Sequence, residues 1–165
     1  MAQRTYRTES ISVHWDSERC AHSGICLRTL PEVFNVAARP WVTIDAAGVD
    51  AIAAAVERCP SGALSYERSD GEPGEIPDDP VTIVPWPHGP LFVRGDVKVL
   101  DRHGEPFPTG SRVALCRCGQ SRNHPFCDAT HRAVGFNSYP HAISEQRDQA
   151  ESPAELERQH DDRIG

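Results

Sequence analysis

The sequence has no long apolar run and no excess of basic charge. No stretch of its 165 residues approaches the length of a membrane span, and residues 1–10 are polar, so we expect neither a signal peptide nor a membrane segment. The formal charge of −7 argues against a nucleic-acid partner, which would select a basic face. From these absences we expect a soluble, cytoplasmic protein.

Apolar residues are also scarce. Only 38% of the residues are hydrophobic, and 14 prolines and 12 glycines interrupt the chain, so we expect two small modules rather than one large core. Such modules usually need a disulfide or a metal centre for stability. In a reducing compartment the six cysteines favour metal ligands or catalytic thiols over disulfides. Because the sequence contains no phosphate loop, nucleotide fingerprint or persuasive Ser/His/Asp arrangement, we do not expect an enzyme.

The negative charge is concentrated in two segments. Residues 69–80 carry five acidic and no basic side chains among prolines and glycines, and residues 141–165 carry seven acidic against three basic. Such segments are typical of solvated linkers and tails. We therefore predict a first unit at 8–68, an acidic linker at 69–80, a second unit at 81–140 and an acidic tail at 141–165.

Local patterns predict an α+β fold, with a small α+β unit followed by a small, mainly β unit and a disordered or weakly helical tail. In the first unit we expect strands at 11–15, 41–44 and 64–67, and helices at 27–34 and 49–58. In the second unit we expect four short strands, at 81–84, 91–93, 97–100 and 112–115. A weak helix is expected at 153–159 in the tail.

Three cysteines and a histidine of the second unit have the spacing of metal ligands. Cys116 and Cys118 are too close to form an unstrained disulfide with each other, but both can bind one metal. Cys127 and His131 are four residues apart, so one helical turn over 128–132 would place both on one side. A Cys₃His set also occurs in zinc sites, although zinc modules commonly place their ligand pairs two to four residues apart on opposite arms.

The order C-x-C-x₂-S-x₃-P-x-C-D-x-[ST]-H resembles the CDGSH (NEET) iron-sulfur family at every marked position. The resemblance implies a 2Fe-2S cluster held by Cys116, Cys118, Cys127 and His131, used for one-electron transfer, redox sensing or cluster transfer. One residue departs from the family: its usual glycine after Cys-Asp is Ala129, which is tolerable unless the backbone needs a positive φ. CDGSH proteins with one motif are often homodimers, so the resemblance allows a homodimer unless the first unit covers that surface.

Residues around this motif have expected roles of their own. An imidazole ligand removes one negative charge relative to a thiolate, so His131 should raise the potential and make it depend on pH. Asp128 is expected to accept hydrogen bonds around the site or to cap the following helical turn, and Ser121 to stabilise the loop. Four arginines add positive charge that could complement a cluster or an acidic partner, although a solvated surface role is the simpler interpretation of each: Arg112, Arg117, Arg122 and Arg132.

The other three cysteines are Cys20, Cys26 and Cys59, the last followed by proline. Compared with the bacterial ferredoxin run C-x₂-C-x₂-C-x₃-C-P, Ser23 stands in place of the middle cysteine. Three thiolates suit a 3Fe-4S cluster, or a 4Fe-4S cluster whose fourth iron takes His22, Ser23, water or a small ligand. A cluster-free domain with three buried thiols is the alternative.

This segment resembles the divergent single-cluster ferredoxin domain, which combines C-x-H-x-G-x-C with a later C-P-x-G-A-L, over residues 8–68. The resemblance implies a compact α+β ferredoxin fold. His22 is better explained as a loop residue beside the site than as a ligand. We therefore expect an iron-sulfur redox protein that passes single electrons between a reductase and an acceptor protein. The alternatives are a cluster carrier or redox/pH sensor, and a zinc-stabilised interaction module.

Overall fold

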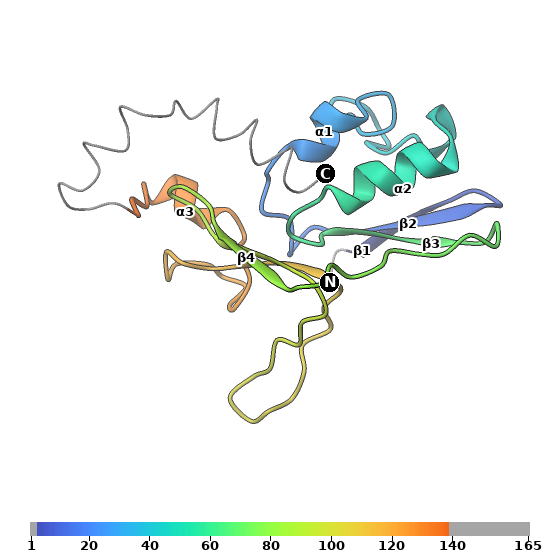
Figure 1. Ribbon diagram of the computed structural model, residues 1–165. Coiled ribbons are helices and arrows are strands. Elements are labelled where there is room, and N and C mark those ends of the chain that lie inside the picture. Colours follow the sequence, from blue (N-terminus) through green and yellow to red (C-terminus); the bar gives the residue numbers. More distant parts are fainter. Residues whose placement is uncertain (1–2, 139–165) are drawn as a thin grey trace.

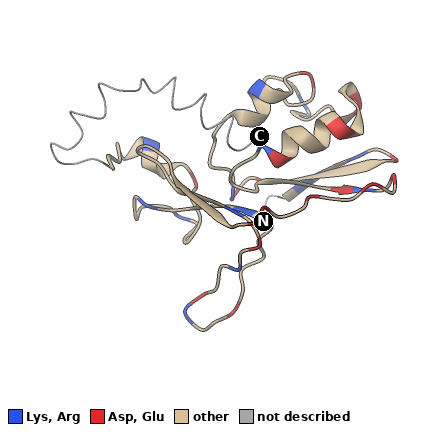
Figure 2. Cartoon of the chain, viewed as in Figure 1, with Lys and Arg blue, Asp and Glu red and all other residues tan. Residues whose placement is uncertain are grey.

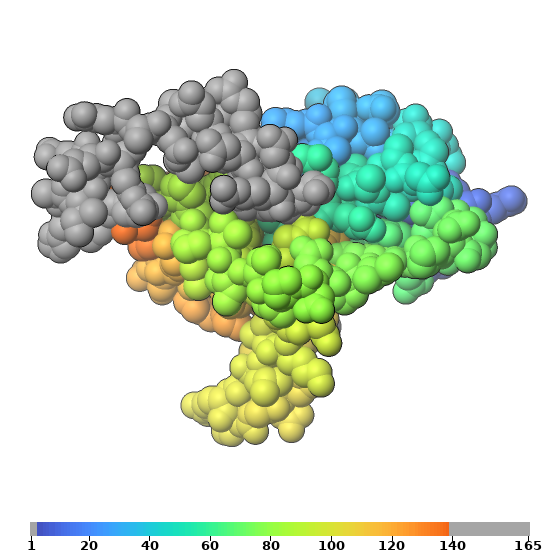
Figure 3. All heavy atoms as spheres, viewed as in Figure 1, coloured from blue at the N-terminus to red at the C-terminus, as the bar shows by residue number. Residues whose placement is uncertain are grey.

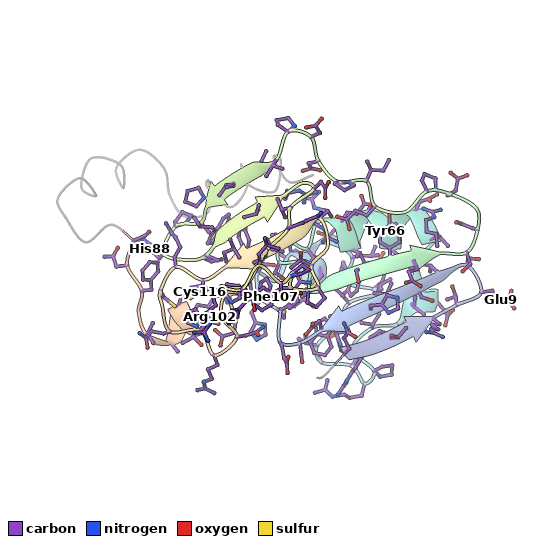
Figure 4. The ribbon with its side chains drawn as sticks, turned by 90° about the horizontal axis from the view of Figure 1, so that it is seen from below. Glu9, Tyr66, His88, Arg102, Phe107 and Cys116 are labelled. Carbon is purple, nitrogen blue, oxygen red and sulfur yellow. The ribbon has the colours of Figure 1, made fainter. Side chains whose placement is uncertain are left out.

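The computed structural model describes residues 3–138 and has an α+β fold. Two antiparallel sheets of three strands each lie side by side, one from each half of the chain (Figures 1 and 4). Short helices cover the first sheet, and one very short helix follows the second. None of the helices in residues 3–138 is long and apolar enough to cross a membrane.

The first sheet has the strand order β1 (Gln3–Arg7), β2 (Ile11–Asp16) and β3 (Leu64–Arg68). Alternation along β2 buries Ile11 and Val13 against helix α2 (Val49–Glu57), which buries Ile52 and Val56 one turn apart. Helix α1 (Ile25–Thr29) also packs near α2. The predictions for β2, α2 and β3 are confirmed to within one residue at their C-terminal ends.

Two local predictions in the first unit need correction, and one strand of that unit was not predicted. The strand expected at 41–44 is absent: Val42 forms only an isolated bridge with Phe34, and the 3₁₀ helix η1 (Ile44–Ala46) follows. Trp41 instead packs its ring edge-on against Trp15, with 5.0 Å between centroids, so this apolar pattern reflects loop packing. The helix expected at 27–34 lies at Ile25–Thr29 and ends before Pro31. The polar strand β1 was not predicted, because its residues are mostly exposed and give no apolar alternation.

The second sheet has the order β4 (Thr82–Pro85), β5 (Leu91–Arg94) and β6 (Arg112–Leu115). Three of the four predicted strands are therefore confirmed, and the one at 97–100 is wrong. Val97 and Val99 pack against the small core around Val113 and Phe126, while Leu100 forms only an isolated bridge. The segment between β5 and β6 projects from the body of the molecule (Figure 3).

Residues 69–80 contain no helix or strand and run from β3 towards β4. Their carboxylates are not all solvated. Asp78 pairs with Arg94 at 2.9 Å, and Glu75 pairs with Arg112 at 2.7 Å. Acidic and basic positions of the described residues are distributed over both units (Figure 2). The predicted acidic tail at 141–165, with its helix at 153–159, lies outside the described residues.

Candidate metal centres

The C-x-C pair of the second unit lies directly after β6. The Sγ atoms of Cys116 and Cys118 are 3.7 Å apart, and both side chains are half-buried. Cys116 is labelled in Figure 4. The backbone N–H of Cys116 donates to Pro125 O at 2.9 Å, which ties the pair to the segment carrying the next ligand. The sheet therefore positions the first two predicted ligands at its end.

Cys127 and His131 form a second pair. The N–H of Cys127 donates to Ala114 O on β6 at 2.8 Å, and His131 lies in helix α3 (Thr130–Ala133), close to the predicted turn at 128–132. The Sγ of Cys127 is 3.3 Å from Nδ1 of His131, and both residues are buried. One helical turn thus brings thiol and imidazole together.

The four side chains form two pairs rather than one tetrahedral group. Within residues 3–138, no three His, Cys, Asp or Glu side chains converge on the position of a single metal ion. A two-iron cluster needs a different arrangement, because each iron takes two protein ligands. The pairs Cys116/Cys118 and Cys127/His131 fit that requirement.

The surroundings shift the pKa values of the four predicted ligands in different directions. Burial lowers the pKa of His131, assisted by the neighbouring charge of Arg132, so the imidazole is neutral and can donate a lone pair. Burial raises the pKa of the Cys127 thiol to about 11. At Cys116 burial acts to raise the pKa, but N–H donors including Ser121 and the adjacent Cys118 thiol outweigh it and lower the pKa. A bound cation would favour the thiolate form of all three cysteines.

Ser121 and Asp128 fasten the loop between the two ligand pairs. The hydroxyl of Ser121 donates to Phe126 O at 2.6 Å and accepts from the N–H of Asn123 at 3.0 Å. The carboxylate of Asp128 accepts from the N–H groups of Arg122 and Thr130 at 2.9 and 3.0 Å. Burial acts to raise the pKa of Asp128, but these donors outweigh it and lower the pKa to about 2. Asp128 thus secures the loop and the first turn of α3 together.

Ala129 occupies a backbone position that favours glycine. Its φ is +70°, in the left-handed region. The backbone at position 129 therefore does need a positive φ, so alanine is strained here. This conformation costs a non-glycine residue about 1–2 kcal/mol. The position explains why the family pattern has glycine after Cys-Asp.

The three cysteines of the first unit come from different elements. Cys20 lies in the loop after β2, Cys26 lies in α1, and Cys59 is buried in the turn after α2. Burial, together with the neighbouring charges of Cys59 and Cys20, raises the pKa of the Cys26 thiol to about 12. Burial also raises the pKa of Cys20, with Cys59 contributing. All three cysteines meet the same core: Cys59 is part of it, and Cys20 and Cys26 pack against it.

His22 and Ser23 lie beside this site. Nδ1 of His22 is 3.1 Å from the Sγ of Cys20, while the side chain is largely exposed, as expected of a loop residue next to the thiol. The hydroxyl of Ser23 accepts from the N–H of Ile25 at 3.5 Å at the start of α1. The fourth-ligand role of either residue stays a prediction.

A cavity of about 320 Å³ adjoins His131. It is lined by residues of the segment after β4 and of the region of α3: Trp86, Pro87, His88, His131, Arg132, Gly135 and Phe136. His88 lies near this end of the second unit in Figure 4. The cavity gives the imidazole end of the site a route to the surface.

The arginines near the site differ from one another. Arg122 and Arg132 are exposed, as a solvated surface role predicts, and Arg117 donates to the carbonyl groups of Gly89 and Trp86 at 2.8 and 2.5 Å. Arg112 contradicts the surface interpretation, because only 2% of its surface is exposed. In the sequence, Arg112 is recognisable only as a charged residue at the start of an apolar strand. That pattern does not identify the groups to which Arg112 donates.

Comparison with known proteins gives a match for each unit. Residues 6–69 match the family model "divergent 4Fe-4S mono-cluster", and residues 88–132 match "iron-binding zinc finger CDGSH type". The first unit is also 38% identical over 65 residues to an uncharacterized protein, YjdI, of Escherichia coli K12 and of E. coli O157:H7. That match covers 39% of this chain and 86% of each relative.

Proposed function

Since the chain belongs to the divergent 4Fe-4S mono-cluster family over residues 6–69 and contains a CDGSH-type iron-binding domain over residues 88–132, we propose that it is a two-cluster protein of one-electron transfer. The observation that carries the proposal is the grouping of ligands in both units. Two pairs, Cys116/Cys118 and Cys127/His131, suit a 2Fe-2S cluster, and three cysteines suit a 3Fe-4S or 4Fe-4S cluster.

Iron-sulfur clusters supply one-electron chemistry when bound. Residues of this chain contribute hydrogen bonds and a neutral ligand to the site of the second unit. Backbone N–H groups of Gln120 and Ala129 donate to the Sγ atoms of Cys118 and Cys127 at 3.5 and 3.4 Å, which stabilises the charge of the thiolates. His131 contributes a neutral nitrogen at the end of the site nearest the cavity.

The exposed basic side chains of Arg122 and Arg132 favour an acidic redox partner protein at this end of the molecule. We propose that the protein works in the cytoplasm without a nucleic acid, a membrane or a substrate that it converts. A homodimer through the second unit remains an expectation of the family resemblance.

Anaerobic purification followed by iron, sulfide and zinc determination tests the proposal. The expected result is iron and sulfide sufficient for two clusters per chain, with the electron paramagnetic resonance (EPR) signal of each cluster in its paramagnetic oxidation state. Zinc in a colourless protein would overturn the proposal in favour of a zinc-stabilised interaction module.

One observation favours a second function, that of a cluster carrier or redox/pH sensor. The cavity of about 320 Å³ at His131 gives an acceptor protein access to the one ligand that a proton can displace. Rapid transfer of the cluster to an apo-ferredoxin on mixing, abolished by His131→Cys, is the result that this function predicts.

A further inference from the structure

The first strand residue of the second unit's β6 is buried in the first unit. The guanidinium of Arg112 donates through Nη1 to Val56 O and Cys59 O at 2.6 and 2.5 Å, and through Nη2 to Leu64 O at 3.1 Å. Val56 lies in the last turn of α2, and Cys59 is a predicted cluster ligand. A residue of the second unit therefore holds the turn that carries a ligand of the first.

All hydrogen-bonding capacity of this guanidinium is used. Nε and Nη2 donate to the two carboxylate oxygens of Glu75, each at 2.7 Å, which completes five bonds from five N–H groups. Glu75 also accepts a hydrogen bond from Ser111. The linker carboxylate thus compensates the buried charge of Arg112, and the linker becomes part of the interface.

The backbones of the two units also approach closely. Gly62 has φ +64°, and a Cβ atom at this position would lie 2.2 Å from Arg112 O. The same carbonyl accepts a hydrogen bond from Arg19 of the first unit at 3.3 Å. Arg19 lies over the ring of Phe126, 5.2 Å from its centroid. Only glycine leaves room for this approach.

A third contact joins the two ligand sets. Ala21, which directly follows Cys20, is 4% exposed and packs with Phe92, Ala114 and Cys127 of the second unit. Cys127 is a ligand of the second set, and Cys20 is a ligand of the first. The residue next to a ligand of one unit therefore shares a buried cluster with a ligand of the other.

We propose that the second unit completes the first site, and that Arg112 and the buried cluster shared by Ala21 and Cys127 hold the two ligand sets as a fixed pair, across which one electron passes within a single molecule. The inference rests on the proposed function. The first site is oxidised by one electron and the second is reduced by one, with no bond made or broken. The electron enters the first site from a one-electron reductase.

The direction of transfer follows from the ligands. His131 replaces a thiolate, which raises the potential of the second site. The three predicted protein ligands of the first site, Cys20, Cys26 and Cys59, are all thiolates, so its expected potential is the lower of the two. Electrons therefore move from the first site to the second.

The relatives help in designing the test. The 65 matched residues make up 86% of the length of each YjdI protein, so the equivalent of the first unit forms most of that chain. A variant that loosens the interface is thus expected to retain the fold of the first unit. The full chain, with both clusters loaded anaerobically, is the material for the experiment.

EPR spectroscopy of the fully reduced protein measures whether the two sites are near each other. The wild type is expected to show spin–spin broadening that is absent from two variants that each lose one cluster, Cys20→Ser and Cys116→Ser. Arg112→Gln and Gly62→Ala should weaken the broadening, while Arg102→Gln, which alters an exposed arginine of the projecting segment, should leave it unchanged.

The outcomes separate the two proposals. If iron and sulfide analysis finds no second cluster, the proposed function fails and this inference fails with it. If both clusters are present but the wild-type spectrum is the sum of the two single-cluster spectra, the inference is wrong and the proposed function stands. The wild-type measurement decides this even if Arg112→Gln does not fold.

Discussion

Replacing Glu75 with glutamine should destabilise the contact between the two units more than any other single change in the linker. The substitution keeps the shape of the side chain but removes the charge that compensates Arg112, whose guanidinium is almost fully buried. Breaking a buried ion pair from one side typically costs about 3–5 kcal/mol. Because the Glu75 side chain is 19% exposed, we expect the lower end of that range, about 3 kcal/mol.

Thermal unfolding monitored by circular dichroism under anaerobic conditions measures this effect. For a chain of this size about 3 kcal/mol corresponds to a decrease in Tm of roughly 6–12 °C. Glu72→Gln is the matched control, since Glu72 is an exposed acid of the same linker and makes no ion pair among the described contacts. Equal Tm values for the two variants would refute the argument that Glu75 compensates a buried charge.

The pH dependence gives a second check on the same pair. Burial acts to raise the pKa of Glu75, but hydrogen bonds and charge from Arg112 outweigh it and lower the pKa. A carboxylate with a lowered folded-state pKa stabilises the fold above its ordinary pKa, and that stabilisation is lost as the pH falls through the folded-state value. The wild type should therefore lose stability in acid more steeply than Glu75→Gln.

Three further changes should have distinct effects. His131→Cys should lower the reduction potential of the second site and flatten the dependence of that potential on pH in a redox titration. The reason is that the new thiolate adds negative charge and the titratable imidazole is lost. An unchanged potential would show that His131 is not a ligand. Ala129→Gly should raise the free energy of unfolding by about 1 kcal/mol, measured by urea unfolding, because it relieves the positive φ; a loss of stability would contradict that strain. Cys59→Ser should remove the visible absorbance and EPR signal of the first site and leave those of the second, whereas loss of both would mean that the sites assemble together; Ser65→Ala, at an exposed position, is the control.

Local sequence signals predicted most of the elements that carry the sites. The alternation of Ile11 and Val13 and the spacing of Ile52 and Val56 identified β2 and α2, because each pattern reports one buried face. The same logic misplaced strands at 41–44 and 97–100, where apolar residues fill a core from loops without pairing in a sheet. The exposed strand β1 gave no such pattern and was missed.

The surroundings of each site were likewise predictable only in part from the sequence. The spacing of Cys127 and His131 was enough to place them on one turn, since residues four apart meet on a helix. The sequence shows alanine where the family has glycine, but only the structure shows that Ala129 has a positive φ. Nothing local marked Arg112 as buried, since its partner Cys59 lies 53 positions away in the chain.

The sequence by itself therefore determined the two ligand sets, because the order and spacing of cysteine and histidine are local properties that a metal centre requires. Tertiary structure decided that the two sets lie against each other. That apposition depends on the five hydrogen bonds of Arg112, the absent side chain of Gly62 and the buried cluster that Ala21 shares with Cys127. Each of these joins residues distant in the chain, and their meeting follows only from how the two sheets pack.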